Sequence, residues 1–239
     1  MIVLLFSLFA SEDLEVDEIV KKAQDTLHLP QHRTEILLVV QKKRRVKEYE
    51  LTLFQDDSGN VGSAEFHRPL RDKGTKYLRK DGGLWMFLPS IEKTKRIAGH
   101  MLNQGVMGSD LSYEEMLVQQ DWTTNYEAQL NQDTIEQESP CFHVTLRAKD
   151  PKNFYAKRVL WIEKEHFVPI REQVYDSSDN LVKEWVRKDL RYIGTQWIPF
   201  YQEIENKRIP TNKTTITVTE IKLEPTLSQD FFSHRWLER

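Results

Sequence analysis

The hydrophobic positions of this chain follow a helical period near the N-terminus and an alternating period over most of the remainder. Between Leu14 and Leu29, apolar residues recur every three or four positions, which predicts an amphipathic helix that Pro30 ends. In Val46–Phe54 apolar and polar residues alternate, which predicts a strand with one buried face. Thr34–Gln41 contains an unbroken apolar run, Ile36–Val40, which predicts a strand buried on both faces. The pattern indicates a mainly β (α+β) protein.

Turn sequences divide the rest of the chain into further short hydrophobic segments. Asp56–Asn60, Asp81–Gly83 and Ser177–Asn180 each suit a hairpin, because Gly and Asn accept the positive φ that tight turns require. Helices do not alternate with the strands, so we expect one antiparallel sheet of about ten or eleven strands. The other predicted strands are Trp122–Leu130, Phe142–Ala148, Lys157–Glu163, Ile170–Tyr175, Leu181–Arg187, Gln196–Glu205 and Thr214–Leu223.

A second, short helix is predicted after a Gly-rich segment, Gly105–Asp110. This segment suits a turn, and its two glycines around a Met also permit a hinge. Ser112 and Glu115 have the spacing of a capping box, which predicts a helix over Tyr113–Gln120. We expect a single domain, residues 11–239, in which two helices lie against the concave face of a strongly curved sheet.

Composition and the first ten residues restrict the compartment and the partners. The net charge of -3 argues against nucleic acid as a partner, since binding its backbone needs a basic face. The run MIVLLFSLFA at residues 1–10 is too short to cross a bilayer, which takes about 20 residues. We interpret it as the remainder of a secretory signal peptide, with a short buried element as the alternative. The only cysteine, Cys141, lies far from this run, so we expect an exported, soluble periplasmic protein that is not lipidated there.

The chain offers little catalytic chemistry. His28 and His32 are four residues apart, but Pro30 breaks the helix that would align them, so we expect no metal and no cofactor. Ser109–Asp110 near His100 lacks the glycine pattern of a nucleophile elbow, so no enzyme is expected. A basic run, weakly predicted to dock a partner or anionic lipid, is better explained as a solvated hairpin tip. It consists of Lys42, Lys43, Arg44 and Arg45.

Aromatic and Met residues are the main indication of a ligand site. Both faces of Trp85–Phe87 are apolar, and one face suffices for a core, so the other is available to line a cavity. The alternative is that these side chains fill the interior. The predicted cavity residues are Tyr49, Leu51, Leu53, Phe66, Trp85, Phe87, Met101, Met107 and Trp161. The predicted lid residues are Ile19, Val20, Ala23, Leu27, Met116 and Leu117.

Several of these segments resemble the outer-membrane lipoprotein-sorting, LolA-like proteins of Gram-negative bacteria. The resemblance rests on Trp85–Ser90, on the basic segment ending at Arg96, and on Met107–Glu115. Lys157–Val174 and Trp197–Pro199 fit the same family. The motif residues are Pro89, Ser90, Arg96, Gly108, Ser109, Asp110 and Tyr113.

This resemblance, to a divergent branch of the family, implies a half-closed antiparallel β-barrel with helices as a lid over an apolar cavity. It implies a carrier that takes lipoprotein acyl chains or another lipid through the periplasm towards the outer membrane. An inner-membrane transporter and an outer-membrane acceptor would then be partners. Two alternatives stay open: an accessory module docking on an exporter of the resistance-nodulation-division type, and a lipid hydrolase or isomerase, which would need a polar pair inside the barrel.

Overall fold

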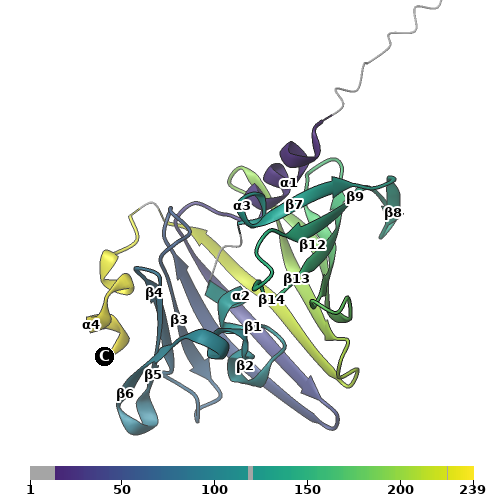
Figure 1. Ribbon diagram of the computed structural model, residues 1–239. Helices are drawn as coiled ribbons and strands as arrows, with labels where there is room; N and C mark the ends of the chain where they lie inside the picture. The colour runs from purple at the N-terminus through teal and green to yellow at the C-terminus, as the bar shows by residue number, and fades with distance from the viewer. Residues whose placement is uncertain (1–13, 118–120, 225) are drawn as a thin grey trace, which may run out of the picture.

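The computed structural model describes residues 14–117, 121–224 and 226–239, so the apolar run at residues 1–10 lies outside it. The described residues form one antiparallel sheet of 14 strands in the order β6-β5-β4-β3-β2-β1-β14-β13-β12-β11-β10-β9-β7, with β8 paired to β9. Figure 1 shows this sheet curving around the short helix α2 (Tyr113–Leu117). The mainly β, antiparallel fold predicted from the sequence is confirmed.

The strands account for most of the chain between His32 and Leu223. Their bounds are β1 His32–Lys42, β2 Arg45–Gln55, β3 Gly62–Arg68, β4 Lys76–Lys80, β5 Gly83–Leu88, β6 Lys93–Ile97, β7 Tyr126–Leu130, β8 Thr134–Glu136, β9 Ser139–Ala148, β10 Lys157–Glu163, β11 Pro169–Tyr175, β12 Leu181–Ile193, β13 Gln196–Asn206 and β14 Asn212–Leu223. All three predicted hairpin turns lie between consecutive strands, as expected.

The helices are few and short. They are α1 Val16–Asp25, α2 Tyr113–Leu117, α3 Trp122–Asn125 and α4 His234–Leu237. The helix α1 ends well before Pro30, because the hydroxyl of Thr26 donates to the carbonyl of Ala23 at 2.8 Å and the chain then turns. The last three residues of the second predicted helix, 118–120, lie outside the described residues.

Two cores lie on opposite faces of the sheet. The inner face, which α2 covers, carries a core that includes Tyr49, Leu51 and Phe66. The outer face carries a second core in which Phe54 and Leu78 pack against the C-terminal segment of the chain. In Figure 1 this C-terminal segment, with α4, lies outside the sheet beside β4. Strand β1 pairs with both β2 and β14, and so joins the two halves of the sheet.

The sequence predictions differ from the structure in three details. The sheet has more strands than the ten or eleven expected, because the short, polar segments β6 and β8 have no hydrophobic alternation. Trp122 begins a helical turn and not a strand, since the side chain of Asp121 accepts a hydrogen bond from the Thr124 amide at 3.0 Å and caps that turn. Strand β1 is well buried on one face only, with Leu37 and Val39 partly exposed.

Candidate functional site

A cavity of about 310 Å³ lies on the inner face, between the segment that follows α1 and the helix α2. Its volume is at the lower end of the range for ligand sites, about 300–1,000 Å³. Leu27 and Met116 approach it from the two helical segments. The apolar wall on the sheet comes from β1, β2, β12, β13 and β14 and consists of Ile36, Leu53, Trp185, Ile198, Val218 and Ile221.

Three charged side chains from adjacent strands also line the cavity. Glu172 on β11 accepts hydrogen bonds from Arg158 on β10 and, at 2.9 Å, from Arg187 on β12. The three side chains are only 5%, 3% and 6% exposed, for Arg158, Glu172 and Arg187 respectively. Arg158 also donates to the hydroxyl of Tyr126 at 3.1 Å and lies over the ring of Tyr155 at 4.9 Å.

The register of the sheet brings these charges together. Glu172 is opposite Leu160 on β10 and opposite Trp185 on β12. Arg158 and Arg187 are each two residues from one of these partners and therefore lie diagonally across from Glu172 on the same face. Burial by itself raises the pKa of Glu172, but the positive charges and hydrogen bonds of the two arginines outweigh burial and lower it. Glu172 is therefore ionised at neutral pH.

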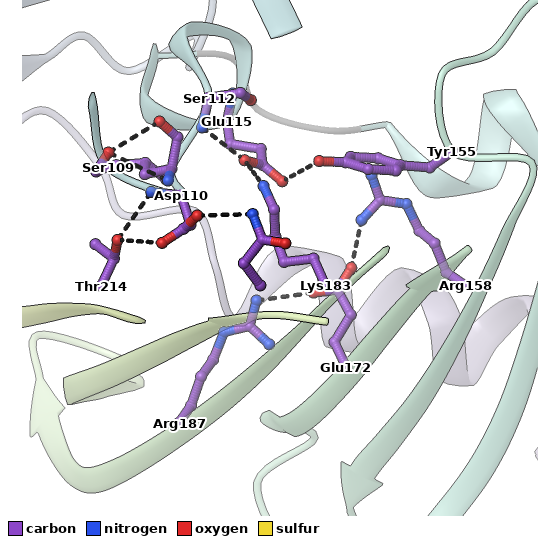
Figure 2. A network of polar contacts seen from close by, with 12 residues as sticks. Ser109, Asp110, Ser112, Glu115, Tyr155, Arg158, Glu172, Lys183, Arg187 and Thr214 are labelled. Atoms are coloured by element: carbon purple, nitrogen blue, oxygen red, sulfur yellow. Dashed lines mark hydrogen bonds and ion pairs between the residues drawn. The ribbon is translucent and has the colours of Figure 1, made fainter. Parts of the chain in front are cut away.

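A second buried ion pair attaches α2 to the sheet (Figure 2). The carboxylate of Glu115 accepts from the ammonium of Lys183 on β12 at 2.7 Å and from the hydroxyl of Tyr155 at 3.0 Å. Burial raises the pKa of Glu115, while the charge of Lys183 and the hydrogen bonds from Lys183 and Ser112 lower it below its ordinary value. The predicted capping box is confirmed: the Ser112 amide donates to Glu115 at 2.8 Å, and the Glu115 amide donates to the Ser112 hydroxyl at 3.1 Å.

The Gly-rich segment before α2 is attached to the sheet by Asp110. The amide of Asp110 donates to the hydroxyl of Thr214 on β14 at 2.8 Å, and that hydroxyl donates back to the Asp110 carboxylate at 3.1 Å. The side chain of Asn206 donates to the same carboxylate at 2.9 Å. The segment therefore forms an anchored turn that leads into the capped helix, as one of the two sequence interpretations expected. Its action as a hinge stays a prediction.

The predicted cavity set is wrong in most of its members. Leu53 lines the cavity, but Tyr49, Leu51 and Phe66 are at most 3% exposed and fill the packed inner core beside it. Met101 and Met107 pack against that core, and the Tyr49 hydroxyl donates to the Met107 carbonyl at 3.3 Å. These residues support the cavity from the inner core without lining it.

Trp85, Phe87 and Trp161 were expected in the cavity and lie on the outer face. Successive side chains of a strand point to opposite faces. Leu84 on β5 therefore joins the inner core, while Trp85 and Phe87 pack with the C-terminal segment. Trp161 on β10 stacks on His143 with 4.9 Å between ring centroids, on the side away from α1. Both faces of these strands are apolar because both faces are covered.

The predicted lid residues lie in two different places, and their action as a lid stays a prediction. Leu27 and Met116 line the cavity. Ile19, Val20 and Ala23 instead pack against β9 and β10, in a core that includes Leu146 and Leu160. These three side chains are buried against the sheet and do not face the cavity. The side chain of Leu117 lies outside the described part of the chain.

The remaining predicted residues lie outside the cavity. Pro89 and Ser90 form a 3-10 turn after β5, and Arg96 lies over the ring of Trp85 at 5.9 Å. Tyr113 packs against Tyr77 at 5.6 Å, and Gly108 has a positive φ of 78° in the turn before α2. The basic run, Lys42, Lys43, Arg44 and Arg45, is exposed at the tip of the β1–β2 hairpin and makes no ion pair among the described residues. Its docking role stays a prediction.

The buried charges were missed, although the sequence contains a signal for them. Arg158 has the same strand parity as the buried Leu160 and Ile162, so it had to lie on the same face as those apolar residues. Glu172 likewise has the parity of the buried Val174. A charged residue on the buried face of a strand predicts an internal ion pair. No local pattern could have paired Glu115 with Lys183.

Solved structures share this fold over almost the whole chain. A protein domain from Vibrio parahaemolyticus described as outer membrane lipoprotein-sorting is 19% identical, with a TM-score of 0.83 and coverage of 93% of this chain and 98% of that one. A DUF1329 family protein from Desulfovibrio piger is 22% identical, with a TM-score of 0.84 and coverage of 92% and 97%. A LolA superfamily protein from Nitrosomonas europaea is 18% identical, with a TM-score of 0.77 and coverage of 94% and 100%.

The fold is therefore that of the outer-membrane lipoprotein-sorting, LolA-like proteins, as the sequence resemblance predicted. A family model described as uncharacterized-protein-like matches residues 61–239, and the chain belongs to that family. No curated protein matches the sequence. Within the described part of the chain, no helix is long and apolar enough to cross a membrane.

Proposed function

We propose that this protein is a periplasmic carrier that holds an acyl chain of a lipoprotein or another lipid in the cavity on the inner face and passes it towards the outer membrane. The main support for this proposal is the cavity itself. Apolar side chains of the sheet line it, and Leu27 and Met116 line it from the helical segments. The apolar run at residues 1–10 supports export. The fold shared with lipoprotein-sorting proteins supports the same class of function.

The cavity suits one chain better than several. Burying an acyl chain contributes about 0.8 kcal/mol per CH₂ group. A chain with a dozen buried groups would therefore gain on the order of 10 kcal/mol before the costs of ordering it. The volume of about 310 Å³ is small for a site that would enclose several chains. Partial occupation also favours release, which a carrier needs as much as binding.

Two ionisable groups of the cavity wall, Glu115 and Glu172, favour binding without catalysis. A general acid or base works best when its pKa is near the working pH. Glu115 and Glu172 instead have a lowered pKa, and each is engaged by cationic partners. Both carboxylates are therefore held in ion pairs, which does not suit the acid or base of a lipid hydrolase.

Native mass spectrometry of the protein purified from a periplasmic extract without detergent tests the proposal. We expect an adduct of lipid or acyl-chain mass that organic extraction removes and identifies. The variant Leu53→Trp should fill the cavity and lose the adduct. The matched control is Ile135→Trp on β8, where the native side chain is 73% exposed.

Two results would contradict the carrier. One is an apo mass with no uptake of added phospholipid or lipopeptide. The other is equal adduct retention in Leu53→Trp and Ile135→Trp. The first result would favour the accessory module, whose contact surface would include the exposed basic tip, Lys42–Arg45.

A further inference from the structure

We infer that the cavity is specific for lipids that end in an anionic group, and that Arg158 and Arg187 bind this group. The inference rests on the proposed function and names the chemical class of its cargo. It derives from the charged wall of the cavity, which an acyl chain alone would not need. The carboxylate of a fatty acid and the phosphate of a phospholipid share the chemistry that two buried guanidinium groups recognise.

The buried network carries one positive charge more than it carries negative charges. Its cations are Arg158, Arg187 and Lys183, and its anions are Glu115 and Glu172. Lys183 is paired with Glu115, so among the described residues Glu172 is the one carboxylate that balances two guanidinium groups. A buried charge without a counterion is strongly unfavourable. An anion that enters the cavity would supply the missing charge.

The guanidinium groups also retain hydrogen-bond donors. Each has five N–H groups. The described hydrogen bonds of Arg158 use its Nε and Nη1 atoms, for Tyr126 and Glu172. Those of Arg187 use Nη1 and Nη2, for the Pro169 carbonyl and Glu172. Both side chains line the cavity, so their remaining N–H groups are available to a ligand there.

Glu172 sets the distance between the two arginines. Because one carboxylate accepts from both, the guanidinium groups are held on either side of it and their charges are focused on one place in the wall. The rings of Tyr126 and Tyr155 lie 5.5 Å and 4.9 Å from the Arg158 guanidinium and restrict its movement. A rigid, pre-positioned cation loses little side-chain entropy when an anion binds. The apolar part of the cavity lining, with Ile36 and Leu53, would take the chain of the same ligand.

Pairs of ligands with the same chain and different charge test this inference. Oleate is compared with oleyl alcohol, and oleoyl lysophosphatidate with mono-oleoylglycerol, by displacement of a fluorescent lipid probe from the full-length protein at neutral pH. We expect the anionic member of a pair to bind at least about tenfold more tightly, a factor typical of a charged contact. A preference confined to the oleate pair identifies a carboxylate ligand, and one confined to the lysophosphatidate pair identifies a phosphate ligand.

The variant Arg187→Gln should weaken the binding of the anionic lipids more than that of the neutral lipids and so remove this preference. The control variant is Arg191→Gln on the same strand, whose side chain is 55% exposed and paired with Asp189 at the surface. This control should keep the preference. Circular dichroism and thermal unfolding check that each variant folds. If Arg187→Gln does not fold, the ligand pairs on the unaltered protein still decide the question.

The outcomes separate the two proposals. Equal affinity for both members of both pairs overturns the anionic specificity and leaves the carrier intact. Failure of all four lipids to bind overturns the carrier itself. A preference that persists in Arg187→Gln overturns the role of this arginine.

Discussion

The carboxylate of Glu115 on α2 lies 2.7 Å from the ammonium of Lys183 on β12, and the two side chains are 6% and 8% exposed. This pair connects the helix over the cavity to the sheet that forms the cavity wall. A helix of one turn is not stable by itself, because nucleation is unfavourable. The position of α2 therefore depends on this ion pair, on its capping box with Ser112, and on the turn that Asp110 anchors to Thr214.

Removing Lys183 should destabilise the protein strongly. In Lys183→Met the carboxylate of Glu115 stays buried without its cation, which typically costs about 3–5 kcal/mol in the free energy of unfolding. Urea unfolding measures the loss, and hydrogen exchange at residues 113–117 reports whether α2 opens. The control Lys213→Met breaks an ion pair with Glu203 at a side chain that is 38% exposed, and should cost less than about 1 kcal/mol. Equal losses of unfolding free energy in the two variants would show that the buried pair stabilises the protein no more than the exposed pair does.

Acid should weaken the folded state through the same carboxylates. Glu115 and Glu172 have folded-state pKa values below the ordinary 4.5, because their cationic partners outweigh the effect of burial. As the pH falls through 4.5, the unfolded state binds protons before the folded state does, so the stability present at neutral pH decreases. The loss is complete once the pH is below the lowered folded-state values.

Thermal unfolding between neutral pH and pH values below this range measures the effect. The variant Glu115→Gln removes one of the titrating groups and should show a shallower decrease of the melting temperature with acid. An unchanged slope would mean that Glu115 does not contribute to the acid sensitivity.

Gly105 should tolerate no larger residue. A Cβ atom at this position would lie 1.8 Å from the carbonyl oxygen of Ser109, which is backbone and cannot move without opening the turn. We expect Gly105→Ala to lower the free energy of unfolding by more than about 2 kcal/mol, the range for strain at a packed site. Gly82→Ala is the control: its φ is 68°, but a Cβ atom there meets nothing within 4 Å. Its cost should be about 1 kcal/mol. A similar loss in both would contradict the close approach at Gly105.

Trp85 should affect stability and leave lipid binding unchanged. It packs on the outer face against the C-terminal segment, with the His234 ring centroid 4.7 Å away. Trp85→Ala should therefore lower the free energy of unfolding by about 3 kcal/mol, the lower end of the range for Trp, since the side chain is only partly buried. Lipid affinity in a displacement assay below the melting temperature should equal that of the unaltered protein. A weaker lipid affinity in the folded variant would contradict this prediction and indicate that Trp85 contributes to the lipid site.

The sequence by itself determined the features that involve neighbours along the chain. The hairpin turns, the alternation in β2 and the capping box of Ser112 and Glu115 are local, because each depends on residues a few positions apart. The combination of these patterns was enough to predict an antiparallel sheet, and the resemblance to a known family added the expectation of a LolA-like fold. The sequence also contained a signal that was missed, because strand parity places charged residues on the apolar faces of β10 and β11.

Only the tertiary structure decided which face becomes a cavity and which charges meet. Glu115 and Lys183 are 68 positions apart, and Asp110 and Thr214 are 104 apart. Strand alternation predicts that Trp85 and Leu84 lie on opposite faces, but not that the C-terminal segment returns to cover Trp85. The physical reason is that burial and ion pairing depend on distances in space, which the register of distant strands sets.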